Sequence, residues 1–452
     1  LQLKFWLAQS NTHNAYGSCK GRGKRTPTYS PYCDGVTLSP DVRRAIVTVA
    51  AVTGAAFLAW RMFDGKYVDL RVYLLGADAL LDGKSLYDSS IAITTKSGLV
   101  LPFTYSPFAA VVLIPFALLP IKLTLAIWTF LCIASLAGIA YLTAQRLPAL
   151  AGKTKPDWAT WEIAAVIFAV AAFAEPIGQN LDVGQVNLMI IFVVMYDTVN
   201  RTKYAGFATG MAAGFKVLPG IFIVFRLVTR RWADFGRALL GFAATLVIGS
   251  FFGVNNVWQY WTSELFKTER VGEIVRTSNL SLRGIATRAL GEDAGTLVWI
   301  ALGIVVVVGG FVLAAMWWDR SRLVAATIVG LMSLLISPIS WPHHWVWLVP
   351  AISICAALAV RAFRSGRAGI GWLLSVAVVA ATIPPMIQLR YIISILIPDD
   401  WFRVWVVGTA YGVAGVLLLV ALGAGVRLVE PGLQSKEDES RARHDNNNHG
   451  DN

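Results

Sequence analysis

Long apolar runs separated by short polar and basic segments dominate the chain from residue 45 onward. The first run covers residues 45–60, and with its flanks it is long enough to cross a bilayer at about 1.5 Å per helical residue. Further runs lie at 123–142, 161–174, 188–198, 238–254, 297–317, 323–340, 344–360, 370–381 and 405–426. This pattern predicts an all-α polytopic membrane protein.

The run at 205–226 differs from the others because Lys216 and Pro219 lie near its middle. Proline ends a helix and a charge is costly inside a membrane, so we expect two short half-spans that meet near Lys216. A snorkelling lysine without a task is the alternative interpretation. A lysine beside a proline break more often binds an anion or a freed carbonyl.

Composition excludes an ordinary soluble domain, because 56% of the residues are hydrophobic and only 15% are charged. The formal charge of +12 is gathered in clusters between apolar runs, such as Arg43 and Arg44 before the first run. This distribution is typical of cytoplasmic loops and argues against nucleic-acid binding. With Arg43 and Arg44 inside the cell, the side of each later loop follows, giving about twelve crossings and two cytoplasmic termini.

Both ends of the chain are polar and lack a sustained period. We expect disordered cytoplasmic tails at 1–42 and 429–452 around a membrane domain at 43–428, with major external loops at 62–122 and 255–292. A polar stretch precedes the first apolar run, which predicts no cleavable signal peptide. The four cysteines have no metal-ligand spacing, and no acidic cluster requires a divalent ion, so we expect no metal and no cofactor.

Polar residues collect on the predicted external side. Asp69 stands where the chain leaves the first span, and a solvated loop is the plain alternative for it. A porter would concentrate such groups at mid-membrane in two repeated halves, and no internal repeat is visible. A polar, anionic and sugar-like substrate is therefore indicated. Besides Asp69, the candidate binding residues are Arg71, Tyr105, Gln185, Asn187, Lys216, Arg276, Asn279, Arg283, His343 and His344.

His343 and His344 have two interpretations. They could belong to an interfacial belt with the neighbouring tryptophans, or they could contact substrate. Adjacent helical residues point about 100° apart, so both rings cannot easily bind one metal. The external arginines depart from the positive-inside pattern, and phosphate binding is a good reason for that.

Several blocks occur in order from residue 68 to 347: V-D-L-R-V-Y, G-A-D-A-L-L-D-G, F-T-Y-S-P-F, G-Q-V-N, G-F-K-V-L-P, R-T-S-N-L-S-L-R-G and S-P-I-S-W-P-H-H-W. They resemble the polyprenyl-phosphate-mannose-dependent mannosyltransferases of actinobacteria, which have the GT-C architecture. Within that family the chain looks most similar to the α-1,2 enzymes that elongate phosphatidylinositol mannosides. A sister enzyme that branches lipomannan and lipoarabinomannan shares the motifs. Ser106 departs from the family, where proline is usual, and we expect little effect on chemistry.

The resemblance implies a plasma-membrane enzyme with its active site on the extracytoplasmic side and Asp69 as general base. The donor would be polyprenyl-phosphate-mannose and the acceptor a phosphatidylinositol mannoside. A mannosyl phosphate carries its own leaving group, so one carboxylate that deprotonates the acceptor suffices, and inversion gives an α-mannoside. Lys216, Arg276, Arg283 and one of the two histidines would stabilise the leaving phosphate. A transporter of lipid-linked sugars is the alternative from another class.

Overall fold

The computed structural model describes residues 39–95, 98, 100–153, 157–200, 202–267, 270–386 and 406–434. Nearly all of them belong to one compact unit that begins at Arg44. The predicted tails at 1–42 and 429–452 lie largely outside the described residues. Their disorder and their cytoplasmic side therefore stay predictions.

Seven helices in the described part of the chain are long and apolar enough to cross a membrane. They are α1 (Pro40–Asp64), α4 (Ile121–Ala144), α11 (Trp232–Ser250), α14 (Glu292–Trp318), α16 (Leu348–Arg364), α17 (Ala368–Met386) and α20 (Gly408–Gly425). The pair α6 (Thr160–Ala172) and α7 (Glu175–Val183) is bent by 69° and would make an eighth span. The protein is thus helical and polytopic as predicted, whereas about twelve crossings and the side of each terminus stay predictions.

Shorter elements complete the fold. Three are apolar helices: α3 (Pro107–Ala117), α8 (Asn187–Val199) and α15 (Arg322–Ile336). The other helices in the described residues are α2 (Val68–Leu81), α5 (Leu147–Leu150), α9 (Phe207–Phe215), α10 (Gly220–Val228), α12 (Val254–Thr262), α13 (Leu282–Leu290), η1 (Glu264–Phe266), η3 (Pro342–Trp347) and η5 (Val426–Leu428). A hairpin of β1 (Ala92–Thr94) and β2 (Val100–Pro102) pairs antiparallel, with Ile93 opposite Leu101.

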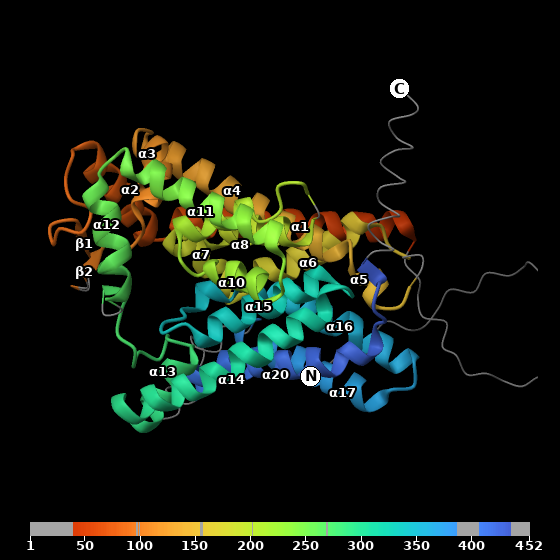
Figure 1. Cartoon of the computed structure of the whole chain (residues 1–452). Coiled ribbons are helices and arrows are strands. Elements are labelled where there is room, and N and C mark those ends of the chain that lie inside the picture. Colours follow the sequence, from red (N-terminus) through yellow and green to blue (C-terminus); the bar gives the residue numbers. More distant parts are fainter. Residues whose placement is uncertain are drawn as a thin grey trace, which may run out of the picture. The chain divides into compact units, whose positions relative to one another are not determined.

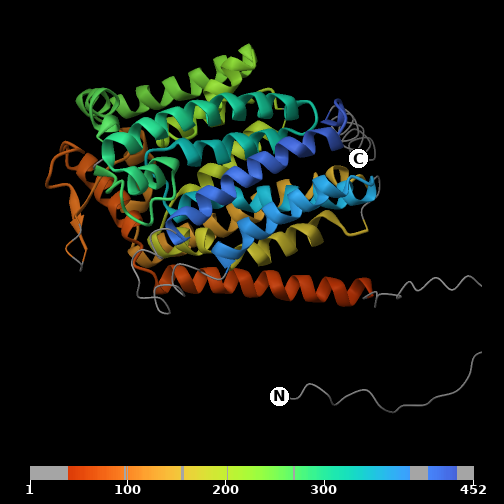
Figure 2. The ribbon, with the colours of Figure 1, turned by 90° about the horizontal axis from the view of Figure 1, so that it is seen from below.

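The long helices run side by side, and α15 lies inside the bundle (Figures 1 and 2). Every residue of α15 from Arg322 to Leu335 is buried. By contrast most side chains of α14 are not buried, and Leu297 and Val305 are 70% and 67% exposed. Apolar side chains that face outward along a whole helix are stable only in contact with lipid.

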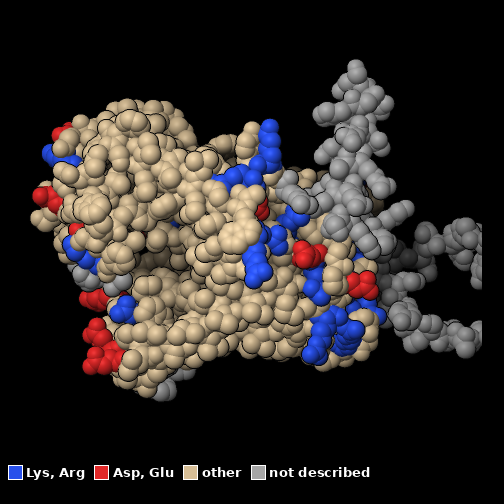
Figure 3. All heavy atoms as spheres, viewed as in Figure 1, with Lys and Arg blue, Asp and Glu red and all other residues tan. Residues whose placement is uncertain are grey.

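Lys and Arg side chains gather at the end of the bundle that carries α5 and the loop between α16 and α17 (Figure 3). Contacts between clusters hold that end together: Arg361 donates to the Ala149 carbonyl at 3.0 Å, and the Arg231 guanidinium lies 3.7 Å from the Trp318 ring centre. Basic clusters far apart in the sequence therefore meet at one end, as the predicted topology requires.

The apolar run at 205–226 is broken as predicted. Helix α9 ends at Phe215, Lys216 is extended with φ −141° and ψ 126°, and α10 begins after Pro219. Ser106 satisfies carbonyls at the broken end, because its hydroxyl donates to the Gly214 carbonyl at 2.6 Å.

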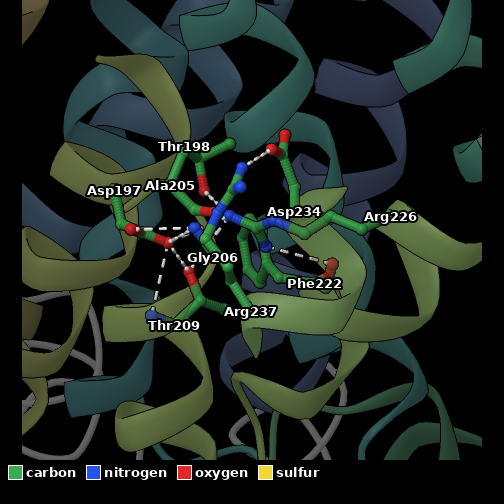
Figure 4. A network of polar contacts seen from close by, with 9 residues as sticks. All are labelled: Asp197, Thr198, Ala205, Gly206, Thr209, Phe222, Arg226, Asp234 and Arg237. Atoms are coloured by element: carbon green, nitrogen blue, oxygen red, sulfur yellow. Dashed lines mark hydrogen bonds and ion pairs between the residues drawn. The ribbon is translucent and has the colours of Figure 1, made fainter. Parts of the chain in front are cut away.

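A buried ion pair holds the end of α10 that is farther from the break against α8 and α9 (Figure 4). Arg226 of α10 donates to Asp197 of α8 at 3.1 Å, to Thr198 at 3.2 Å and to Thr209 of α9 at 3.1 Å. Asp197 also accepts from the Gly206 backbone N–H at 2.9 Å. Both charges are nearly fully buried, and their mutual satisfaction locks α8, α9 and α10 into one arrangement.

The segment after α1 is not a solvated loop. Helix α2 buries Leu70, Tyr73 and Ala77 in the main apolar core, while Asp78 and Asp82 are exposed. The later aspartates of this segment therefore lie on the solvated face of α2. Tyr67 starts the helix in a left-handed conformation with φ 35°, and its N–H donates to the Asp182 carbonyl at 2.8 Å.

Candidate active site

A large cavity lies where the ends of these elements meet. Its volume is about 1230 Å³, and its walls come from the start of α2, the hairpin, the segment before α8, the break at Lys216, the segment after α12 and the approach to η3. Among the described residues, six Lys or Arg and three Asp or Glu side chains line it, which is an excess of positive charge. Such a cavity favours an anionic ligand.

Most of the predicted site residues line this one cavity. They are Asp69, Arg71, Tyr105, Gln185, Lys216, Arg276, His343 and His344. Asn187, Asn279 and Arg283 are not among the lining residues. The sequence therefore identified segments that lie hundreds of residues apart and yet converge on a single space.

Asp69 enters the cavity from the first turn of α2. Its Oδ2 accepts a hydrogen bond from Gln185 Nε2 at 2.7 Å. Burial raises the pKa of the Asp69 carboxyl, while the Gln185 hydrogen bond and the charge of Lys216 oppose that rise. A carboxylate with a raised pKa beside an open cavity is suited to take a proton from a bound hydroxyl.

The Gln185 amide connects Asp69 to Lys216. Its Oε1 accepts from Tyr73 at 2.8 Å and from Lys216 Nζ at 3.3 Å, and its Nε2 lies 3.3 Å from the Tyr105 hydroxyl. Gln185 is 4% exposed. The buried amide thus holds a carboxylate and an ammonium at a fixed spacing.

Lys216 is held by amides. Its Nζ donates to Asn187 Oδ1 at 2.7 Å and lies 5.5 Å from the Tyr105 ring centre. In the part of the chain that the structure describes, no carboxylate forms an ion pair with it. A lysine that projects into a cavity without a carboxylate partner is available to an anion.

His343 and His344 of η3 also line the cavity. Their rings are perpendicular with centres 4.7 Å apart, and His344 Nδ1 accepts from the Trp341 backbone N–H at 3.2 Å. The Nε2 of His343 has no hydrogen-bond partner among the described residues. The His343 carbonyl receives the amide of Asn187 at 3.1 Å and that of Asn180 at 2.8 Å, which ties η3 to α7 and α8.

The remaining candidates differ in position. Arg276 is exposed at the cavity rim with its Nε 3.5 Å from the Glu273 carboxylate. Arg283 lies over the Trp299 ring at 5.0 Å, outside the lining. Asn279 is fully buried, donates to the Ile274 and Pro338 carbonyls and accepts from two backbone N–H groups, so its side chain supports the loop instead of facing the cavity.

Tyr73 was not predicted as a site residue from the sequence, and neither were the ion pairs of Glu264 with Lys267 and Arg270. Tyr73 follows Asp69 by four residues, and this helical spacing on one face was the available signal. Glu264 accepts from Lys267 at 2.8 Å and forms an ion pair with Arg270, whose Nη2 reaches the Phe103 carbonyl at 3.2 Å. Among the described residues, no group of three or more His, Cys, Asp and Glu side chains is arranged to hold a metal ion.

A helical membrane protein whose cavity holds Asp69 and Lys216 on one buried amide, within an excess of positive charge, is suited to bind and act on an anionic substrate. Comparison with known proteins narrows this class. Residues 103–338 match the sequence model of Glycosyltransferase family 87. The chain belongs to this family of glycosyltransferases.

Characterised relatives cover most of the chain. A polyprenol-phosphate-mannose-dependent alpha-(1-2)-phosphatidylinositol pentamannoside mannosyltransferase of Mycolicibacterium smegmatis is 33% identical over 392 residues, covering 85% of this chain and 92% of the relative. A phosphatidylinositol mannoside mannosyltransferase with the same donor and linkage, from Mycobacterium tuberculosis, is 30% identical over 348 residues, covering 72% and 79%. No solved structure matches the chain significantly.

Proposed function

We propose that this chain is an inverting mannosyltransferase that moves mannose from polyprenyl-phosphate-mannose to a phosphatidylinositol mannoside in α-1,2 linkage. The four relatives that match are all named as enzymes with this donor, linkage and class of acceptor. The observation that carries the proposal is the connection of Asp69 to Lys216 through the Gln185 amide at the wall of one cavity.

The chemistry assigned to these groups is a single displacement. Asp69 removes the proton from the acceptor 2-hydroxyl as its oxygen bonds to the anomeric carbon, and the bond from that carbon to the phosphate oxygen breaks. The carboxylate keeps the proton and the polyprenyl phosphate leaves with an additional negative charge. Attack opposite a β-linked phosphate gives the α-mannoside.

Lys216 is assigned to the leaving phosphate. Its ammonium is held by two amide oxygens and is paired with no carboxylate among the described residues, so it gains most when the phosphate develops charge. His343, whose Nε2 is buried without a partner there, is assigned to the same phosphate or to the acceptor. The sequence assigned Arg276 to the leaving phosphate, but because it is exposed at the rim beside Glu273, we assign Arg276 and Arg71 to the phosphodiester of the acceptor instead.

The finer topology belongs to the same proposal. We infer a GT-C architecture with about twelve crossings, cytoplasmic termini and the cavity on the extracytoplasmic side of the plasma membrane. The concentration of basic clusters at the end of the bundle that carries α5 supports this orientation. A transporter would need access to its site from both ends of the bundle, and the described lining residues of this cavity come from helix ends, the hairpin and loops that meet at one place.

The deciding experiment is mannosyl transfer by the purified protein, with radiolabelled polyprenyl-phosphate-mannose and phosphatidylinositol mannosides of defined size. Asp69→Asn keeps the shape of the side chain but cannot act as a base, so turnover should fall about 100-fold to 10,000-fold while both substrates still bind. Asp78→Asn, on the exposed face of the same helix, is the matched control and should transfer at the wild-type rate. Label that stays in the donor with the wild-type protein would exclude the proposed activity.

A further inference from the structure

Tyr73 is a polar residue in the core that the proposed chemistry does not use. It is fully buried on α2, and it is not among the residues that line the cavity. Its hydroxyl lies 2.8 Å from Gln185 Oε1 and 3.0 Å from the Tyr105 hydroxyl. Burial raises the pKa of the Tyr73 phenol well above its usual value, so the hydroxyl keeps its proton and remains a donor.

The Gln185 amide needs such a donor because its two ends have nearly the same shape and opposite roles. With Oε1 toward Tyr73, Nε2 donates to Asp69 Oδ2 at 2.7 Å. In the flipped orientation the amide oxygen would face the Asp69 carboxylate, and two acceptors would oppose each other. A hydrogen-bond donor fixed beside the amide oxygen of Gln185 therefore keeps the amide N–H directed at Asp69.

Two groups donate to that oxygen, and they differ in what else they do. Lys216 lies 3.3 Å away and faces the cavity, where the proposed function uses its ammonium for the donor phosphate. Tyr73 is closer, and no substrate reaches it. Tyr73 is thus the donor that stays in place through a catalytic cycle.

We propose that Tyr73 is a positioning residue that sets the orientation of the Gln185 amide and, through it, the Asp69 carboxylate. This inference rests on the proposed function, in which Asp69 is the general base. The spacing on α2 makes the arrangement rigid, because Asp69 and Tyr73 are four residues apart and share one face of a helix.

A packing role is the competing explanation. The Tyr73 ring meets the Tyr105 ring edge-on at 4.7 Å and lies 6.0 Å from the Trp128 ring. Phenylalanine would keep both contacts and lose only the hydroxyl. Tyr73→Phe therefore separates positioning from packing.

For Tyr73→Phe we expect kcat to fall about tenfold, the loss typical of one hydrogen bond. The KM values for donor and acceptor should stay within about twofold, because Tyr73 touches neither. The acid limb of the pH profile should move to higher pH, since the Gln185 hydrogen bond is among the causes that lower the Asp69 pKa. Tyr87→Phe is the control: its buried hydroxyl donates to the Tyr105 carbonyl at 2.8 Å, and Gln185 is not among its partners.

A double-mutant cycle tests whether Tyr73 acts through the amide. In a Gln185→Leu background, Tyr73→Phe should cause no further loss of kcat and no further shift of the acid limb. A wild-type kcat and pH profile in Tyr73→Phe, or a full loss that persists in the Gln185→Leu background, would overturn the inference. Asp69→Asn is measured beside them: retained turnover there refutes the proposed base, whereas an inactive Asp69→Asn with an unaffected Tyr73→Phe refutes only the role of Tyr73.

Discussion

Asp69 is a partly buried carboxylate at the wall of a cavity with an excess of positive charge. Burial and nearby positive charge shift its pKa in opposite directions. Burial raises its pKa and is the largest cause, while the Gln185 hydrogen bond and Lys216 lower it. The net shift is upward, so a proton is bound more tightly in the folded protein than in the unfolded chain. Ionised Asp69 therefore opposes folding at neutral pH while it serves the reaction.

This shift predicts a pH dependence. A general base is active only when ionised, so kcat/KM should fall as the pH drops through the Asp69 pKa, at a pH above the ordinary range of an aspartate. Folding stability should change in the opposite sense, rising as the pH falls through the same pKa. Rates and thermal unfolding measured across the acidic range test both. An acid limb at the pH of an ordinary exposed aspartate would contradict the assignment.

Lys216 gives a second prediction at this scale. Lys216→Met keeps the length of the side chain and removes its charge, so the loss of one charge-assisted contact to the leaving phosphate should cost about 1.5–3 kcal/mol of transition-state stabilisation, a fall of roughly 10-fold to 150-fold in kcat/KM for the donor. Lys203→Met, an exposed lysine beside Tyr204, is the control and should behave as wild type. Wild-type donor kinetics in a folded Lys216→Met protein would return Lys216 to the snorkelling interpretation.

At the scale of elements, the broken pair α9 and α10 depends on the ion pair between Asp197 and Arg226. Removing one partner from a buried pair leaves the other charge unpaired, which costs about 3–5 kcal/mol. Arg226→Met should therefore destabilise the protein strongly, and the double variant Asp197→Asn with Arg226→Met should recover part of the loss. Thermal unfolding in detergent measures both. Equal stability of wild type and Arg226→Met would show that the pair does not hold the break.

Some elements were predictable because their causes are local. The break near Lys216 was visible because a lysine and a proline interrupt an apolar run, and α4 lies over the predicted crossing at 123–142. The Gln185 centre was not predictable in detail. Gln185 is 116 residues from Asp69 and 31 from Lys216 in the chain, and their contacts arise from tertiary packing that no local pattern encodes.

The helix boundaries in the segments predicted to be external were also missed, for a related reason. Helix α2 has a weak separation of polar and apolar faces, because its buried side is covered by α3 and the hairpin and its exposed side includes only a few charges. Its sequence was therefore compatible with a solvated loop. Asn279 resembled a ligand in the sequence because amides serve both sites and loops, and only its four backbone partners distinguish the second role.

The orientation of the whole molecule is open to direct test. Ser85 and Ser365 are exposed, Ser85 just beyond α2 and Ser365 after α16. With Cys19 and Cys33 replaced by serine, and Cys132 and Cys355 buried, Ser85→Cys should react with a membrane-impermeant maleimide on intact cells. Ser365→Cys should react only after permeabilisation. The reverse pattern would invert the proposed topology.

The ion pair of Arg226 also constrains how the protein is made. Helices α9 and α10 have 9 residues each, and a spanning helix needs about 20. Arg226 lies in the last turn of α10, and leaving its charge unpaired would add a cost to the insertion of that helix. Its partners on α8 and α9 are synthesised earlier, so α10 can leave the translocation channel favourably only when α8 is still beside it. Biosynthesis should therefore deliver these three helices to the lipid together.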